Sequence, residues 1–80
     1  MTPDNMCQKW YKHVNDLYYL YVIDKRYNLY NGVHYNCKVF YSDTFLPASV
    51  TPFSLTLKEL REVYIELSKE ESIMIQLAVL

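Results

Sequence analysis

Apolar and polar residues alternate through the middle of this chain, in two strand-like runs on either side of Asn31 and Gly32. Asn-Gly favours the two-residue type I′ turn, because both central positions of that turn need positive φ. Gly32 is the only glycine in the protein. The pattern therefore predicts a hairpin over Tyr18–Tyr41, with Tyr30 opposite Val33.

The register that follows from this turn mixes the two faces of the hairpin. It sets Asn28 opposite Tyr35 and Arg26 opposite Cys37, so polar residues share the face that should be apolar. A bulge or break at residues 24–26 would restore the alternation. A two-stranded ribbon and a three-stranded meander both remain open.

A helix is expected before the hairpin. Thr2 can cap it, Pro3 suits the first helical position, and Asp4 places an acid in the first turn. These signals predict a helix over residues 3–15. Apolar residues follow at helical spacing: Met6, Trp10, Val14 and Leu17.

A second helix start lies after an expected loop over residues 42–56, which holds two prolines. Thr56 and Glu59 have the spacing of a capping box, in which each side chain bonds the backbone N–H of the other residue. We therefore expect a helix over residues 57–70. Its apolar stripe is Leu57, Leu60, Val63, Tyr64 and Leu67.

Residues 72–80 are apolar at nearly every position, which predicts a buried central strand. The predicted order of elements is then α-β-β(-β)-α-β. This order indicates the α+β class, with one antiparallel sheet and both helices packed on one face of it. Eighty residues are expected to form a single domain over residues 1–80.

Nine tyrosines are the outlier in the composition. A small core cannot bury nine phenol hydroxyls without partners, so several rings should remain exposed and form a contact surface. A net charge of −1 argues against general phosphate binding.

A cytoplasmic protein without membrane contact is expected, because the N-terminus is polar and the chain has no long apolar run. The two cysteines are then expected to be free thiols, with one disulfide as the alternative.

Catalytic and metal sites are not expected. His34 and Cys37, with Cys7 and His13, supply zinc-ligand chemistry, but residues three apart on a strand point to opposite faces. A single glycine excludes a glycine-rich phosphate loop, and no strained nucleophile turn accompanies the cysteines. We expect no enzyme activity, no cofactor and no bound metal.

A partner protein is the expected ligand. Tyrosines supply rigid aromatic contact area, and carboxylates spaced along a helix can imitate a DNA backbone and meet a basic target. The runner-up is a binder of single-stranded nucleic acid that uses the same tyrosines with Lys25, Arg26 and Lys38. A homodimer through the sheet edge or the tyrosine face is a third alternative. The expected partner-binding residues are Tyr19, Tyr21, Tyr27, Tyr30, Glu59, Glu62 and Glu66.

Residues 53–64, with their capped acidic helix start, and the apolar residues 73–80 resemble small phage-encoded inhibitors in the order of their elements. Inhibitors of uracil-DNA glycosylase and anti-CRISPR proteins are similar in this way. The resemblance implies an anti-defence phage protein in the host cytoplasm that inhibits a larger host or defence protein. It further implies that the target handles nucleic acid, as a processing enzyme or a nuclease complex does.

Overall fold

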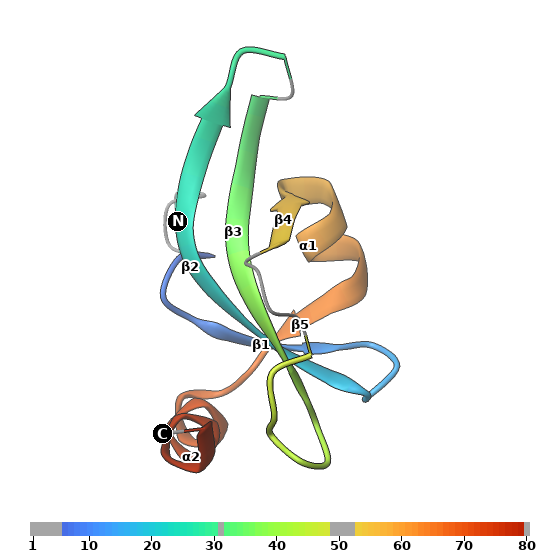
Figure 1. The fold of residues 1–80 in the computed structure, drawn as a ribbon, viewed down its shortest axis with the longest axis vertical. Helices are drawn as coiled ribbons and strands as arrows, with labels where there is room; N and C mark the ends of the chain where they lie inside the picture. The colour runs from blue at the N-terminus through green and yellow to red at the C-terminus, as the bar shows by residue number, and fades with distance from the viewer. Residues whose placement is uncertain (1–5, 31, 49–52, 80) are drawn as a thin grey trace.

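The computed structural model describes residues 6–30, 32–48 and 53–79. They form an α+β fold with a curled five-stranded antiparallel sheet and two helices (Figure 1). The elements in chain order are β1 (Trp10–His13), β2 (Tyr18–Asn28), β3 (Gly32–Tyr41), β4 (Phe53–Thr56), α1 (Leu57–Val63), β5 (Tyr64–Glu66) and α2 (Lys69–Val79). The observed order β-β-β-β-α-β-α corrects the predicted α-β-β(-β)-α-β.

The strands lie in the order β4-β3-β2-β1-β5, and every neighbouring pair is antiparallel. The two edge strands, β4 and β5, are joined in sequence by α1, which contacts both of them. This connection curls the sheet around α1 (Figure 1). The long β2–β3 hairpin extends well past the other strands and ends in a projecting tip.

The hairpin is present, but the predicted register is wrong. Asn28 pairs with Gly32 and Tyr27 with Val33, so three residues connect the strands instead of two. Gly32 has φ 73°, and a left-handed residue at this place is typical of three-residue hairpin loops. Asn31 itself lies outside the described residues. The pairs predicted for Tyr30, Asn28 and Arg26 are therefore not formed, and their predicted partners on β3 pair with other residues of β2.

A bulge corrects the alternation, as expected, but it lies at Ile23, just before the predicted segment 24–26. The register shifts between Val22 and Asp24, and β2 continues without a break. Val22 therefore faces the core, whereas the Asp24 carboxylate accepts a hydrogen bond from Asn36 Nδ2 at 3.0 Å. The hairpin is two-stranded, and β1 adds the third strand of a meander.

The predicted helix over residues 3–15 is wrong in its described part, because residues 10–13 form β1. Trp10 and Tyr11 are both buried and are neighbours on one strand, so they serve opposite faces of the sheet. A helix could not place both in two separate cores while also pairing with β2 and β5. Val14 is left exposed instead of completing a helical stripe. Residues 3–5 lie outside the described part.

The capping box is confirmed, but its helix is shorter than predicted. Glu59 N–H donates to Thr56 Oγ1 at 3.2 Å, and Thr56 N–H donates to Glu59 Oε1 at 3.3 Å. The helix ends at Val63 because the next residues, Tyr64 and Ile65, pair with β1 as β5. Pairing with β1 outweighs the helical continuation to residue 70.

The predicted strand over residues 72–80 is a helix, α2, over its described residues. Ser68 caps it, accepting a hydrogen bond from Glu71 N–H at 3.2 Å. Ile75 is buried, but most of the other apolar side chains of α2 are exposed, so the segment is not central to the fold. The predicted loop over residues 42–56 is also corrected at its end, because Phe53–Thr56 form β4.

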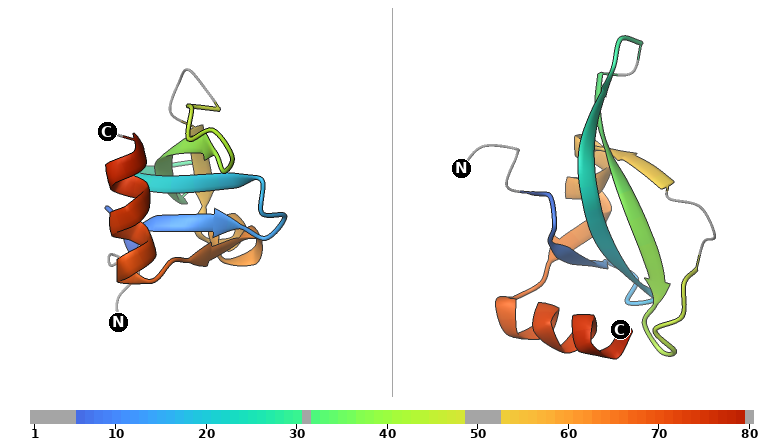
Figure 2. Two further views of the ribbon diagram at one scale, coloured as in Figure 1. Left: turned by 90° about the horizontal axis from the view of Figure 1, so that it is seen from below. Right: turned by 60° about the vertical axis from the view of Figure 1, so that its left-hand side comes forward.

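Each face of the sheet carries its own apolar cluster. One contains Tyr11 and Leu20 and is covered by Leu60 of α1; the other contains Trp10 and is covered by Ile75 of α2. The expectation that both helices pack on one face is therefore wrong. Figure 2 shows α2 running across the strand direction, apart from α1.

Candidate contact surfaces

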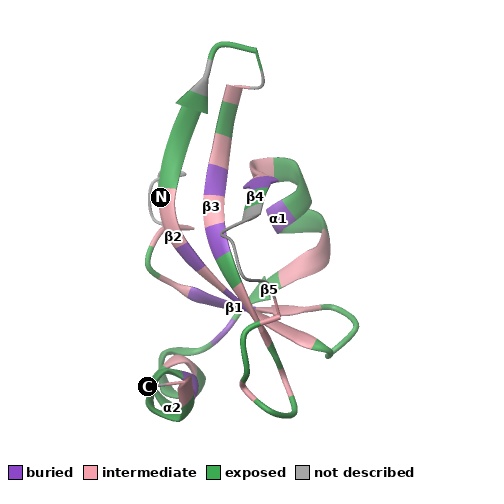
Figure 3. Ribbon diagram, in the orientation of Figure 1, coloured by how far each residue is buried: buried purple, intermediate pink, exposed green. Residues whose placement is uncertain are grey.

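The most exposed aromatic side chains lie at the tip of the β2–β3 hairpin. Tyr30 is 95% exposed and Tyr27 is 71% exposed, and both were predicted to bind a partner. Leu29 and Val33 lie beside them and are exposed as well. We call Tyr27, Leu29, Tyr30 and Val33 the hairpin-tip surface. In Figure 3 the upper part of β2 is coloured as exposed, whereas the upper end of β3 alternates between intermediate and exposed.

The strand register explains why apolar residues reach solvent here. Cys37, Tyr35 and Val33 follow one another on the same face of β3, and Val33 is paired with Tyr27. Leu55 of β4 pairs with Tyr35, which is fully buried. The last pair of β4 joins Thr56 to His34, and the hairpin extends past both β4 and α1 (Figure 1). The apolar face of the core therefore continues onto the tip without a covering layer.

Basic residues flank the hairpin-tip surface. Lys25 and Arg26 are exposed on β2, directly before Tyr27. The Arg26 guanidinium lies 3.5 Å from the Asp24 carboxylate, and the two side chains are 65% and 44% exposed. Such an exposed ion pair contributes little to stability, about 0–1 kcal/mol, so Arg26 can exchange it for a partner at small cost.

Tyr19 and Tyr21, also predicted to bind a partner, lie elsewhere. Both are half-buried beneath α2, on the face of the sheet that carries Trp10. The ring centroids of Trp10 and Tyr21 are 4.9 Å apart, and the ring of Tyr19 stacks on Phe45 with centroids 6.0 Å apart. These two tyrosines support the second apolar cluster and do not join the hairpin-tip surface.

The three predicted glutamates do not share one helix face. Glu59 is engaged in the capping box, and Glu62 is exposed on α1. Glu66 lies on β5, where its carboxylate is 3.7 Å from Lys9 Nζ. The helix ends before it reaches Glu66, so the continuous acidic helix surface expected from the sequence is not formed.

An aromatic row that the sequence analysis missed crosses four strands at the other end of the sheet. The ring centroids of His13 and Tyr64 are 5.0 Å apart, those of His13 and Tyr18 are 6.1 Å apart, and those of Tyr18 and Tyr41 are 5.7 Å apart. Burial raises the pKa of the Tyr64 hydroxyl. Strand pairing was the missing information, because these four residues are neighbours only across β5, β1, β2 and β3.

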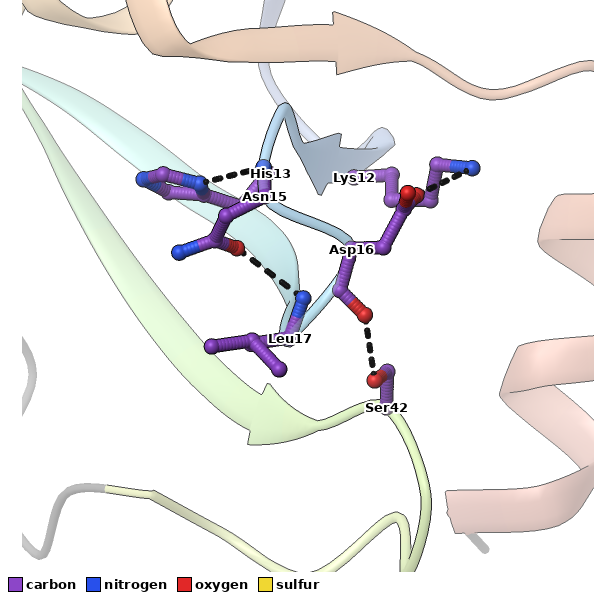
Figure 4. A network of polar contacts seen from close by, with 6 residues as sticks. All are labelled: Lys12, His13, Asn15, Asp16, Leu17 and Ser42. Atoms are coloured by element: carbon purple, nitrogen blue, oxygen red, sulfur yellow. Dashed lines mark hydrogen bonds and ion pairs between the residues drawn. The ribbon is translucent and has the colours of Figure 1, made fainter.

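Polar contacts hold the β1–β2 turn beside this row (Figure 4). Asn15 N–H donates to His13 Nδ1 at 3.1 Å, and Ser42 Oγ donates to the backbone oxygen of Asp16 at 2.7 Å. Lys12 Nζ is 2.8 Å from the Asp16 carboxylate, and this hydrogen bond raises the pKa of Lys12. These contacts tie the turn to β1 and to the end of β3.

The cysteines are free thiols and do not resemble a reactive site. Cys37 is fully buried, and burial raises its pKa to about 12; burial also raises the pKa of Cys7. His34 and Cys37 lie on opposite faces of β3. Among the described residues, no three His, Cys, Asp or Glu side chains are grouped so as to hold a metal ion. No helix in the same part of the chain is long and apolar enough to cross a membrane.

Alkaline pH should destabilise the fold through Cys37. The unfolded thiol ionises near its ordinary pKa of 9.0, whereas the native thiol keeps its proton up to about pH 12. The native state therefore binds more protons in this window, and the free energy of unfolding should fall by roughly 1.4 kcal/mol per pH unit above pH 9. Below pH 9 the thiol contribution should be complete.

Urea unfolding followed by circular dichroism at a series of pH values measures this decline. A Cys37→Ala variant is the control, since it keeps only the loss that Cys7 and the tyrosines cause and should decline less steeply above pH 9. Buried Tyr11, whose pKa is also raised by burial, will add to the decline at higher pH in both proteins. An equally steep decline in the two proteins would contradict the assignment to Cys37.

Comparisons with protein-family models, with curated proteins and with solved structures give no significant match. The resemblance to phage inhibitors therefore stays a prediction.

Proposed function

We propose that this chain is a small non-catalytic binding protein that inserts its hairpin tip into a larger protein and inhibits it. The observation that carries the proposal is the hairpin-tip surface. Tyr27, Leu29 and Tyr30 are large, strongly exposed and adjacent at the end of a projecting hairpin. Exposed apolar groups gathered in this way are typical of contact surfaces, and tyrosine is enriched where binding energy is concentrated.

The rigid base of the tip supports this use. Tyr35 and Cys37, which follow the tip on β3, are fully buried, so the core of the protein holds the tip in place. A surface that the folded protein already holds in place loses little conformational entropy when it binds a partner. The narrow, projecting shape suits a cleft on the partner better than a flat surface (Figure 1).

The proposed target is a protein that handles nucleic acid, as the resemblance to phage inhibitors implies. DNA mimicry is not part of this proposal, because Glu66 lies on β5, apart from Glu59 and Glu62 of α1, and Glu59 is engaged in the capping box. Inhibition is therefore assigned to physical occupation of a cleft by the tip. We place this action in the cytoplasm, where Cys7 and Cys37 would remain as free thiols.

The test is capture from host lysate with wild-type protein and with the double variant Tyr27→Ala/Tyr30→Ala. Loss of these rings should weaken binding about tenfold for each tyrosine, because a contact worth more than about 1 kcal/mol is removed each time. Retained proteins are identified by mass spectrometry, and the affinity of the purified target is then measured by calorimetry.

Tyr41→Ala is the matched control, since this tyrosine is exposed but lies away from the tip. It should bind the target as wild type does. Glu62→Lys tests the acidic route. If Glu62→Lys abolishes capture and the tip variant retains it, the acidic helix and not the tip makes the contact.

A second candidate function is binding of single-stranded nucleic acid. Exposed Lys25 and Arg26 next to Tyr27 favour it, because bases stack on aromatic rings beside cations. Fluorescence anisotropy with a labelled oligonucleotide separates the two functions. Binding that weakens steeply with added salt and is lost in Tyr27→Ala/Tyr30→Ala would support this candidate over the first.

A further inference from the structure

A groove lies between helix α2 and strands β1 and β5. Its volume is about 370 Å³, at the lower end of the range found for small-molecule sites. Its apolar lining comes from four side chains: Trp10, Leu67, Ile73 and Leu77. Ile73 is 52% exposed and Leu77 is 71% exposed, so both keep apolar surface that a bound ligand would remove from water.

One side of α2 faces this groove. The lining residues of α2 recur every three or four positions, as one side of a helix requires: Lys69, Ser72, Ile73, Gln76 and Leu77. Lys69 lies in the first turn, and Leu77 lies about two turns further along the helix, about 12 Å away. The lining therefore has a cation towards one end of α2 and an apolar side chain towards the other.

The two uncharged polar side chains that α2 contributes already have partners within the chain. Gln76 Oε1 accepts a hydrogen bond from the indole Nε1–H of Trp10 at 3.2 Å. Ser72 Oγ donates to the backbone oxygen of Ser68 at 2.9 Å. Both groups therefore hold the wall of the groove in place, and a ligand is left to the apolar side chains and the charges.

The charges of the lining leave one ammonium group over. The Glu66 carboxylate is 3.7 Å from Lys9 Nζ, so these two opposite charges offset each other. Lys69 is exposed and has no ion-pair partner among the residues that the structure describes. Its neighbours in sequence, Glu70 and Glu71, do not line the groove. The lining is therefore complementary to a ligand with an apolar body and an anionic head.

We propose that this groove binds a medium-chain alkyl carboxylate, with the alkyl chain along Ile73 and Leu77 and the carboxylate at Lys69. A linear molecule with a charge at one end matches the separation of Lys69 from Leu77 along α2. Burial of the chain against the apolar lining supplies most of the binding energy. The exposed ion pair with Lys69 adds less and sets the direction of the chain.

This site is separate from the hairpin tip. The tip and α2 lie at opposite ends of the molecule (Figure 1). The two proposals can therefore fail independently, and Tyr30→Ala should bind the carboxylate as wild type does.

Isothermal titration calorimetry of the full chain with sodium octanoate tests the site. Trp10 is the only tryptophan in the protein, so its indole N–H signal in a proton–nitrogen NMR spectrum reports on the groove. We expect saturable binding and a shift of this signal. Ile73→Ser and Leu77→Ser should each raise the dissociation constant about tenfold, because less apolar surface is buried in the complex.

Met74→Ser is the matched control for these two variants. Met74 is 69% exposed on the same helix but does not line the groove. The control carries a similar loss of apolar surface and the same change of helix propensity. It should bind octanoate as wild type does.

Ligands with other head groups test the role of Lys69. Lys69→Gln should raise the dissociation constant of octanoate about fivefold and leave that of 1-octanol unchanged, because only the carboxylate pairs with the ammonium group. Octylammonium should bind wild type more weakly than octanoate, since Lys69 repels it. Lys58→Gln, which removes an exposed lysine of α1, is the control and should change none of these affinities.

Absence of binding heat together with an unchanged Trp10 signal would overturn the proposal. Octanoate affinity that stays at the wild-type value in both Ile73→Ser and Leu77→Ser would overturn the site. Octylammonium that binds as tightly as octanoate would overturn the assignment of the carboxylate to Lys69.

Discussion

Leu60→Ala is expected to lower the free energy of unfolding by about 3 kcal/mol, as truncation of a buried leucine does. Leu60 is fully buried, and it joins α1 to Tyr11, Leu20 and Tyr35 on the inner face of the sheet. A domain of this length has a total stability of about 4–12 kcal/mol, so this one change removes a large share. Urea unfolding followed by circular dichroism measures it.

The matched control for Leu60→Ala is Leu46→Ala. Leu46 is the same residue type but is exposed, and its truncation should change the free energy of unfolding by less than about 0.5 kcal/mol. A loss below about 1 kcal/mol for Leu60→Ala would mean that α1 does not stabilise the cluster that contains Tyr11 and Leu20.

Trp10→Ala is expected to release α2 from the sheet while the hairpin stays folded, at a cost of about 3–4 kcal/mol. Among the described residues, those buried in the second cluster are Trp10, Leu67 and Ile75, so this cluster depends on the indole ring. The variant also loses the hydrogen bond to Gln76. Hydrogen exchange measured by NMR should show loss of protection in α2 before loss in β2 and β3.

Trp10→Phe separates packing from hydrogen bonding. Its ring can keep contacts with Tyr21 and Phe40, whose centroids lie 4.9 and 5.5 Å from that of Trp10. The loss should be about 1 kcal/mol, and α2 should keep its protection. If α2 and the hairpin lose protection together in Trp10→Ala, the two clusters form one cooperative unit and the expectation is wrong.

Features that depend on neighbours in the chain were predictable from the sequence. The capping box of Thr56 and Glu59 forms as expected, because both partners are within one helical turn. The hairpin between β2 and β3 and a bulge within it also follow from alternation. At the candidate surface, the exposure of Tyr27 and Tyr30 could be expected from the excess of tyrosines. The exposure of Leu29 and Val33 could be recognised only once the strand register was known.

The sequence alone determined the α+β class, the central hairpin, the capped start of α1 and the presence of exposed tyrosines, since these rest on short-range geometry and on composition. Only the tertiary structure decided that residues 10–13 form a strand and that the apolar C-terminal segment forms α2. Trp10 and Tyr11 extend into β1 because two neighbouring strands and two separate clusters stabilise that conformation. Periodicity along the chain cannot show which surfaces the rest of the molecule will cover.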